Sequence, residues 1–374
     1  MRFLILSCNT GEGHNSAAKA IKEYFEKMGE VCEIKDALSF WSPEKSRIIC
    51  KGHVFLYRNI PKLFGIGYRF EENHPPKKGK ESIVYELMKN GCKSLLKMLK
   101  KADYDAVICT HLFSAMMMTE LRKNDKYIIP TYFVATDYTC YPCTNESSVD
   151  GYFIPHKQLT DEFIKGGISK ERLIPSGIPV KSTFYDNILP EKAKHKLHLP
   201  LDKKIVLLMC GSMGCGPIKT LTEELPQMLP EDAHLAVICG NNRKLYNKLN
   251  KDGHSENVSV VGYTTRVSLY MDAASLILTK AGGLSSTEAA VKGLPMIFVD
   301  AVPGCETKNL DFFKSNGFAD TATDGYELSR LVCSYLKDGN KLEIMSSRLK
   351  TSFDFIAVEN IYNYIQKDIE NGKV

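Results

Sequence analysis

The sequence contains no long hydrophobic run. No stretch reaches the roughly 18 consecutive apolar residues typical of a membrane-spanning helix, so we expect no transmembrane segment. The first apolar run is short and ends in a glycine-rich loop, so we expect no secretory signal. The twelve cysteines lack the spacing of a disulfide framework. They are therefore expected to be reduced thiols of a cytoplasmic protein.

The sequence also offers little for a metal site. Cys140 and Cys143 have the spacing of half a zinc site, but no second pair accompanies them. We expect ordinary thiols here, with no metal or other cofactor required. Nucleic acid is not an expected partner, because no recognised nucleic-acid module accompanies the basic residues.

Short apolar runs alternate with helix-like segments along the whole chain. Apolar runs without polar alternation, separated by helices, are typical of parallel strands buried on both faces. Strands are expected at 2–7, 31–35, 106–110, 131–135, 151–155, 205–210, 235–239, 258–261, 276–279 and 296–299. Helices are expected at 16–28, 94–100 and 285–292, among others. The pattern predicts an α/β protein with two doubly wound parallel sheets.

With 374 residues, the chain is too long for one ordinary core, and two domains are expected. The glycine-proline turn at 176–179 ends the first series of strands, which places the domains at 1–180 and 181–351. The last segment, 352–374, is expected to form one or two helices that cross back to the first domain.

Two stretches of the second half are candidates for nucleotide binding. The first, Gly211-Ser212-Met213-Gly214-Cys215-Gly216, follows an apolar strand, and its glycines would let backbone N–H groups approach an anion. Many such turns are glycine-rich for packing reasons alone. The second stretch, 279–309, is more specific, because a strand ending at Lys280 leads through Gly282 and Gly283 into a helix.

In that helix, Ser285 and Ser286 are expected to act as N-caps, and Glu288 is placed in the first turn. Glu288 could be a capping carboxylate, or it could accept hydrogen bonds from both hydroxyls of a ribose. Upstream, Gly262 and Tyr263 close a strand. There, backbone groups could bind the edge of a nucleobase and the aromatic ring could lie beside it.

The order of these motifs resembles glycosyltransferase family 28, in the branch of the diacylglycerol glycosyltransferases. That branch holds the plant monogalactosyldiacylglycerol synthases and the bacterial processive diacylglycerol glucosyltransferases. The resemblance covers nearly the whole chain. It rests on TGEGHNSAAKAI (10–21), VATDYTCYPC (134–143), GIP (177–179), GSMGCGPI (211–218), VVGYTTRVSLYM (260–271) and the segment 279–309.

The resemblance implies a glycosyltransferase B fold of two facing Rossmann-like domains. The second domain would bind a UDP-sugar, UDP-glucose or UDP-galactose, and the first would present the acceptor, diacylglycerol. The implied donor-binding residues are Gly211, Ser212, Gly214, Gly262, Tyr263, Lys280, Gly282, Gly283, Ser285, Ser286, Glu288, Glu306 and Asn309. Within this set Glu306 would bind hydroxyls of the sugar, with Asn309 nearby. A glutamine is usual in the family where this chain has Cys305, so that contact departs from the pattern.

The resemblance also implies inversion by direct displacement, which requires a base for the attacking hydroxyl. His14 follows the glycine loop at the head of a helix, where the helix dipole disfavours an imidazolium. It is the expected base, against the alternative of a surface cap. Asp137, at a strand end, is the second candidate, either as the base or to orient His14. His111 has the same topological position, although Leu112 stands where the family usually has proline.

The positive charge of the chain is concentrated in one segment. Residues 41–101 contain fourteen Lys or Arg and five Asp or Glu, a net +9, so the remainder of the chain has a net charge of −4. Within it, residues 55–80 interleave aromatic and aliphatic side chains with cations. This mixture suits the surface of an anionic bilayer, so we expect a peripheral protein on the inner face of the cell membrane. An ordinary core helix and a solvated loop are the alternative.

Three other functions are compatible with parts of the pattern. The first is a related transferase with a polyprenyl-linked or other saccharide acceptor, and the second is a UDP-sugar epimerase of the same fold. The third is a dinucleotide-dependent oxidoreductase, which Gly11-x-Gly13 followed by Asp36 superficially allows. Ser16 stands in place of the third glycine of that fingerprint.

Overall fold

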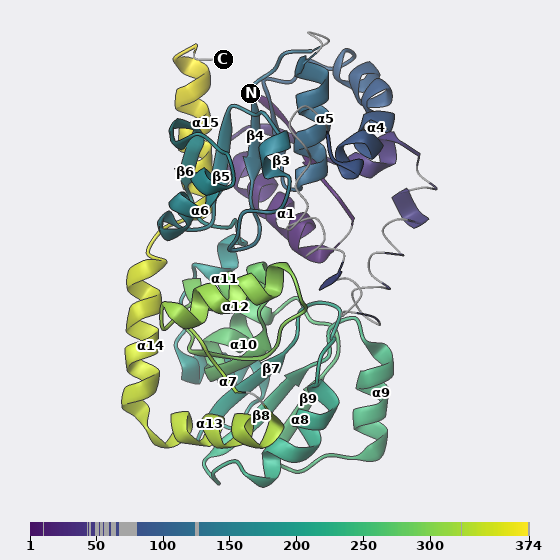
Figure 1. Ribbon diagram of the computed structural model, residues 1–374. Coiled ribbons are helices and arrows are strands. Elements are labelled where there is room, and N and C mark those ends of the chain that lie inside the picture. Colours follow the sequence, from purple (N-terminus) through teal and green to yellow (C-terminus); the bar gives the residue numbers. More distant parts are fainter. Residues whose placement is uncertain are drawn as a thin grey trace. The chain divides into compact units, whose positions relative to one another are not determined.

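The computed structural model describes residues 1–9, 11–42, 44, 46–48, 52, 55, 60, 65–66, 81–123, 127–322 and 324–372 (Figure 1). The chain divides into two compact units. The first comprises Met1–Ser182, Val302–Cys305 and Phe355–Val374, and the second comprises Thr183–Ala301 and Glu306–Asp354. The last helix of the chain therefore belongs to the first unit.

The first unit is built on a six-stranded sheet with the strand order β2-β1-β3-β4-β5-β6, and all neighbouring strands are parallel. The strands are β1 (Arg2–Ser7), β2 (Val31–Asp36), β3 (Ala106–Cys109), β4 (Thr131–Val134), β5 (Gly151–Ile154) and β6 (Leu173–Pro175). The α-helices are α1 (Glu12–Lys27), α4 (Ile83–Leu99), α5 (Leu112–Lys123), α6 (Thr160–Lys165) and α15 (Ala357–Glu370).

The second unit has its own six-stranded parallel sheet, in the order β12-β11-β10-β7-β8-β9. Its strands are β7 (Lys204–Met209), β8 (Ala233–Ile238), β9 (Val258–Val261), β10 (Ala274–Lys280), β11 (Met296–Asp300) and β12 (Asp320–Thr321). Its α-helices are α7 (Pro190–Leu197), α8 (Ile218–Glu224), α9 (Arg243–Asp252), α10 (Val267–Ala273), α11 (Gly283–Val291), α12 (Cys305–Ser315), α13 (Gly325–Lys337) and α14 (Gly339–Ser352).

The prediction of an α/β protein with two parallel sheets is confirmed. All ten expected strands form, and in most of them the apolar residues are buried on both faces of a sheet, whereas the edge strands β2 and β9 are partly exposed. Two strands were not expected, β6 and β12, which are short and lie at sheet edges. Helix α4 is much longer than the expected 94–100, and α1 begins at Glu12 rather than at Ser16.

Helix α15 completes the core of the first unit. Figure 1 shows it in yellow beside the purple and teal elements of that unit. Its Val358, Ile361 and Ile365 join one buried cluster with Ile21 and Phe25 of α1. The apolar face of α15 thus covers the same side of the sheet as α1.

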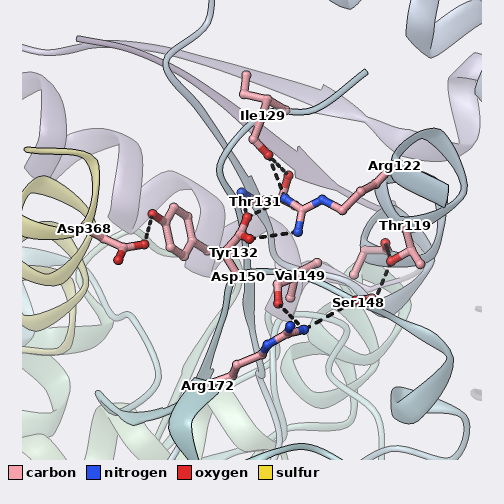
Figure 2. Close-up of polar contacts among 11 residues, drawn as sticks. Thr119, Arg122, Ile129, Thr131, Tyr132, Ser148, Val149, Asp150, Arg172 and Asp368 are labelled. Atoms are coloured by element: carbon pink, nitrogen blue, oxygen red, sulfur yellow. Dashed lines mark hydrogen bonds and ion pairs between the residues drawn. The ribbon is translucent and has the colours of Figure 1, made fainter. Parts of the chain in front are cut away.

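Hydrogen bonds at the amino ends of β4 and β5 hold this sheet together. Figure 2 shows the guanidinium of Arg122 against the carboxylate of Asp150, with Nη1–Oδ1 at 2.8 Å. Asp150 also accepts a bond from the N–H of Thr131 at 2.8 Å. In the same view, Tyr132 of β4 donates to Asp368 of α15 at 2.8 Å, which ties the last helix to the sheet. These contacts lie at the amino ends of the strands, at the end of the sheet opposite the candidate site.

Candidate active site

The strand order of the first unit defines where a site can form. The chain leaves β1 for β2 on one side of the sheet, and β3 lies on the other side of β1. Ligands in open α/β sheets bind beyond the carboxyl ends of the strands at such a switch point. Leu6 pairs with Cys109 in register, so the segments after β1 and β3 begin at the same level. His14 and His111 come from these two segments.

His14 is half-buried in the first turn of α1. Its Nδ1 lies 2.9 Å from the carbonyl oxygen of Thr110 and 2.8 Å from Oγ1 of Thr136. The ring of His111 meets it edge-on, with 4.5 Å between ring centroids. The ends of β1, β3 and β4 therefore all contribute to the surroundings of His14.

Asp137 is connected to His14 through two hydroxyl groups and not directly. Oγ1 of Thr136 lies 3.2 Å from the hydroxyl of Tyr141, which donates to Oδ2 of Asp137 at 2.7 Å. Burial, followed by the charge of Asp137, raises the pKa of Tyr141 well above its usual value. Neither Thr136 nor Tyr141 stands out in the sequence, since only the folding of the loop after β4 aligns their hydroxyls.

Burial lowers the pKa of His14 to about 4, and the hydrogen bond with the Thr110 carbonyl opposes this only in part. The side chain is therefore a neutral imidazole at neutral pH. This state was expected from the sequence as an effect of the helix dipole, whereas desolvation is the main cause. A neutral imidazole is the form that can accept a proton.

A second group of hydrogen bonds fixes the turn that carries His14. Ser7 donates to Oδ1 of Asn15 at 2.7 Å, Asn15 donates to Oδ1 of Asn9 at 2.8 Å, and Asn9 donates to Asp36 at 3.1 Å. These bonds join the ends of β1 and β2 to the first turn of α1. They give Asp36 a structural role in this turn.

Neither glycine of this turn is required by the packing of the described residues. A Cβ on Gly11 or on Gly13 would meet none of their atoms within 4 Å. Gly11 has φ −173° and ψ 159°, an extended conformation that any residue adopts. The space beside both residues is therefore open.

In the second unit, β7 and β10 are neighbours although β8 and β9 separate them in sequence, so a switch point lies between them. Met209 pairs with Thr279, which brings the loop after β7 level with Lys280. The glycine loop 211–216 and the turn at Gly282 both start at this point. The two candidate stretches for nucleotide binding are thus adjacent in the fold.

All three glycines of the loop have positive φ, and Gly216 has the largest value, +95°. Gly214 has φ +57°, and a Cβ there would lie 2.0 Å from the carbonyl oxygen of Cys239. Gly211 has φ +69° but faces open space. Ser212 is exposed, and its carbonyl accepts a bond from the N–H of Asn241 at 2.8 Å. The loop is therefore packed against the segment that follows β8.

The helix after β10 begins earlier than expected. Gly282 is its N-cap, and α11 starts at Gly283, so Ser285 and Ser286 lie inside the helix and do not cap it. Glu288 consequently lies in the second turn and not in the first. Within the helix the first hydrogen bond runs from the N–H of Ser286 to the carbonyl of Gly282, so the amides before Ser286 precede the helical ladder. The buried hydroxyl of Ser286 has no hydrogen-bond partner among the described residues.

An ion pair lies at the carboxyl end of β10. Nζ of Lys280 lies 3.0 Å from Oε1 of Glu306, and both side chains are buried. A Cβ on Gly282 would lie 3.6 Å from the same carboxylate oxygen. Asp300, at the end of β11, has a pKa raised by burial, with the charge of Lys280 opposing the change. The carboxylate of Glu306 therefore lies close to the turn at Gly282 that leads into α11.

Asn309 is fully buried, and its Nδ2 donates to the carbonyl of Ala281 at 2.9 Å. This bond supports the Gly282 turn, so the amide nitrogen of Asn309 is already hydrogen-bonded within the protein.

Gly262 follows β9 and packs near Tyr246 of α9, whose ring would lie 3.6 Å from a Cβ on Gly262. Tyr263 is exposed. Tyr246 is a second aromatic side chain near the expected uracil-binding position, and it does not stand out in the sequence.

Part of the expected membrane-binding segment 55–80 lies outside the described residues, which include only 55, 60 and 65–66 of it. None of the described helices is long and apolar enough to span a membrane. Cys140 and Cys143 are not joined by a disulfide. In the part of the chain that the structure describes, no three His, Cys, Asp or Glu side chains are grouped to hold a metal ion.

Two family models match the chain. The model of monogalactosyldiacylglycerol (MGDG) synthase matches residues 14–180, and the model of the glycosyltransferase family 28 C-terminal domain matches residues 205–304. Together, the two matches show that the chain resembles the diacylglycerol glycosyltransferase branch of glycosyltransferase family 28 along most of its length. The first model covers His14 and Asp137, and the second covers the glycine loop, Lys280 and Glu288. The resemblance identified from the motifs is confirmed.

Several bacterial relatives are similar over nearly the whole chain. The chain is 29% identical to the processive diacylglycerol beta-glucosyltransferase of Bacillus licheniformis, over 93% of this chain and 90% of that protein. For the protein of the same name from Bacillus cereus, the identity is also 29%, over 94% of this chain and 90% of that protein.

Solved structures of the same fold include enzymes with different activities. MurG of Acinetobacter baumannii is similar with a TM-score of 0.64 and 16% identity, over 98% of this chain and 99% of that chain. The UDP-GlcNAc 2-epimerase of Neisseria meningitidis bound to UDP-GlcNAc is similar with a TM-score of 0.59 and 14% identity, over 98% of this chain and 100% of that chain. These similarities confirm the glycosyltransferase B type of fold, and they do not discriminate between transferase and epimerase.

Proposed function

We propose that this protein transfers glucose or galactose from a UDP-sugar to the hydroxyl of diacylglycerol, with inversion at the anomeric carbon. The observation that carries the proposal is the similarity to processive diacylglycerol beta-glucosyltransferases along more than nine-tenths of the chain. A proton acceptor at the switch point of the first unit and a glycine-rich site at the switch point of the second support it.

In this proposal the second unit binds the donor. The open first-turn amides of α11 and the Lys280 ammonium offer positive charge to a diphosphate. The loop at Gly211, Ser212 and Gly214 would lie against the same group, together with Gly282, Gly283, Ser285 and Ser286. The unpartnered Ser286 hydroxyl supports this assignment, because a buried hydroxyl gains from a hydrogen-bonding ligand.

The remaining donor contacts follow the shape of the nucleotide. Glu288 would bind the ribose, and Gly262 and Tyr263 would contact the uracil, with Tyr246 as a further aromatic. Glu306 would bind hydroxyls of the sugar while it stays paired with Lys280. Asn309 would act by holding the Gly282 turn, since its amide nitrogen already bonds to Ala281.

The first unit would supply the acceptor and the base. His14, neutral at physiological pH, would take the proton of the diacylglycerol hydroxyl while that oxygen attacks the anomeric carbon. The bond from the anomeric carbon to the diphosphate oxygen breaks, and UDP leaves with the electron pair. Helix amides and Lys280 would stabilise the departing charge, so we expect transfer to continue in excess chelator.

The segment 55–80 would place this unit on the anionic inner face of the cell membrane. Deletion of the segment should weaken binding to phosphatidylglycerol vesicles and lower transfer to vesicle-bound acceptor. Unchanged vesicle binding after the deletion would reject the anchor without affecting the proposed reaction.

Purified protein incubated with labelled UDP-glucose or UDP-galactose and diacylglycerol vesicles tests the function directly. Labelled lipid in the organic phase is the expected result, and its chromatographic size reports how many sugars are added. A parallel reaction without acceptor should leave the UDP-sugar unchanged, whereas interconversion of sugars there would indicate an epimerase. If neither donor yields labelled lipid, the proposal is wrong.

A further inference from the structure

The contacts around His14 have a defined direction. A carboxylate only accepts hydrogen bonds, so the Tyr141 hydroxyl must donate to Asp137. The oxygen of Tyr141 is then left to accept from Thr136, and the oxygen of Thr136 is left to accept from His14. The Thr110 carbonyl also only accepts, which requires the same proton on Nδ1 of His14. Both partners of Nδ1 therefore demand that it carries a hydrogen.

This assignment determines the role of the other ring nitrogen. In a neutral imidazole one nitrogen carries hydrogen and the other holds a lone pair. With hydrogen on Nδ1, the lone pair is on Nε2. Hydrogen bonds that point the same way along a chain polarise one another, most strongly when the chain ends on a charge.

We propose that Thr136 and Tyr141 are positioning residues that link His14 to the carboxylate of Asp137. The linked groups hold His14 with hydrogen on Nδ1 and the lone pair on Nε2. They also stabilise the imidazolium that forms during transfer. The inference rests on the proposed function, in which His14 is the base, and it assigns Asp137 an indirect role.

The proton inventory of the step is simple. The hydroxyl proton of the acceptor moves to Nε2 of His14 as the new bond to the anomeric carbon forms and UDP departs. The hydrogens on Nδ1 of His14 and on the hydroxyls of Thr136 and Tyr141 stay on their own atoms. The hydrogen bonds that lead from His14 to Asp137 become shorter. Nε2 then releases its proton to solvent, which restores the neutral ring.

Tyr141→Phe removes one hydroxyl from the middle of this chain. Losing a hydrogen bond to a charged group should lower kcat by about 10- to 100-fold. The KM for the UDP-sugar should stay unchanged, because donor contacts lie in the second unit. Tyr152→Phe is a matched control, since its ring also packs against Phe133 and its hydroxyl bonds to Ser147 at 2.6 Å. Equal kcat in the two variants would overturn the proposal.

Asp137→Asn and the double variant with Tyr141→Phe test whether the residues act as one unit. The double variant should be no slower than the slower single variant, because either change already separates His14 from the carboxylate. Loss of all activity in Asp137→Asn, with Tyr141→Phe near the control, would instead identify Asp137 as acting directly. Additive losses would also contradict the proposal.

A nuclear magnetic resonance measurement tests the assignment without any turnover. In protein labelled with ¹⁵N-histidine, the His14 signals are those absent from His14→Gln. We expect hydrogen on Nδ1 in the wild type, and a shifted Nδ1 signal in Tyr141→Phe but not in Tyr152→Phe. Hydrogen on Nε2 would overturn the proposal even if glycolipid is made. If the expected spectra appear but no glycolipid forms, the proposed function fails and the hydrogen-bonded chain remains.

Discussion

The ammonium of Lys280 lies 3.0 Å from Oε1 and 3.4 Å from Oε2 of Glu306, and the two side chains are 7% and 8% exposed. A buried charge pair of this kind is costly to break, because the remaining charge stays in a poorly solvated place. Lys280 is the last residue of β10, which pairs with β7, the strand before the glycine loop. In the proposed function the same ammonium would bind the diphosphate, so the pair would couple the stability of the second unit to donor binding.

Glu306→Gln should lower the free energy of unfolding by about 3–5 kcal/mol, since it leaves the buried ammonium without this carboxylate. Saturating UDP should recover part of the loss, because a diphosphate can supply the missing negative charge. Urea unfolding with and without UDP measures both effects.

Glu223→Gln is the control for this change. It breaks an exposed pair with Lys219 at 2.9 Å and should cost less than about 1 kcal/mol. A Glu306→Gln protein that unfolds at the same urea concentration as this control would show that the buried pair does not matter for stability.

The glycine loop of the second unit offers a comparison between two positions with positive φ. Gly211→Ala should cost about 1–2 kcal/mol, the strain of a left-handed conformation, since its side chain would enter open space. Gly214→Ala should cost more, because its Cβ would also meet the Cys239 carbonyl. We expect weaker UDP binding for Gly214→Ala in titration calorimetry, as the whole loop must move. Equal unfolding free energies for the two variants would contradict this reading of the loop.

The sheets could be predicted from the sequence because buried parallel strands leave a local signal. Runs such as Phe3–Leu6 and Val206–Leu208 are apolar at every position, and no neighbouring segment is needed to recognise them. Strands β6 and β12 lack this signal, since edge strands are short and partly exposed. The early start of α11 was missed for a related reason, because an extended glycine N-cap leaves no side-chain mark in the sequence.

Three residues of the candidate site were predicted from the sequence, and they stay predictions. His14 was singled out after a glycine loop and Asp137 at a strand end, whereas Glu306 was implied only by the resemblance to the family. Tyr141 and Thr136 were not predicted, because their importance depends on hydroxyl positions after the loop has folded. The role of Asn309 as a support of the turn at Ala281 was likewise hidden, since sequence shows the amide but not its partner.

The burial of His14 should be visible in the pH dependence of stability. A histidine in the unfolded chain titrates near pH 6.5, whereas the pKa of His14 in the folded protein is about 4. Between these values the unfolded chain binds the proton more readily. The stabilisation is therefore complete above pH 6.5 and is lost as the pH falls towards 4.

His14→Gln should remove this contribution, so its unfolding free energy should change less with pH over the same window. His254→Gln, a change at an exposed histidine, should keep the slope of the wild type. Urea unfolding at several pH values between 4 and 7 measures the difference. Parallel curves for wild type and His14→Gln would indicate that His14 has the same proton affinity in the folded and unfolded states.

For turnover, His14→Gln should lower kcat by about 10²- to 10⁴-fold with UDP affinity retained.

At Gly13, the requirements of folding and of ligand binding can be tested separately. It lies in the first turn of α1, next to His14, and a Cβ there would meet no atom of the part of the chain that the structure describes within 4 Å. Alanine is favoured over glycine in helices by about 0.5–1 kcal/mol, so folding alone gives no reason for this glycine. The open space is then expected to admit the acceptor beside the base.

Gly13→Ala should leave the unfolding free energy unchanged or raise it, while the KM for vesicle-bound diacylglycerol rises several-fold and that for the UDP-sugar does not. Gly339→Ala provides the matched control, because Gly339 begins α14 and a Cβ there also meets no atom within 4 Å. It should change neither KM. If Gly13→Ala binds the acceptor as the wild type does, the space beside Gly13 is not where the lipid hydroxyl enters. If it loses stability instead, the backbone of the turn needs glycine for a reason other than the approach of a ligand.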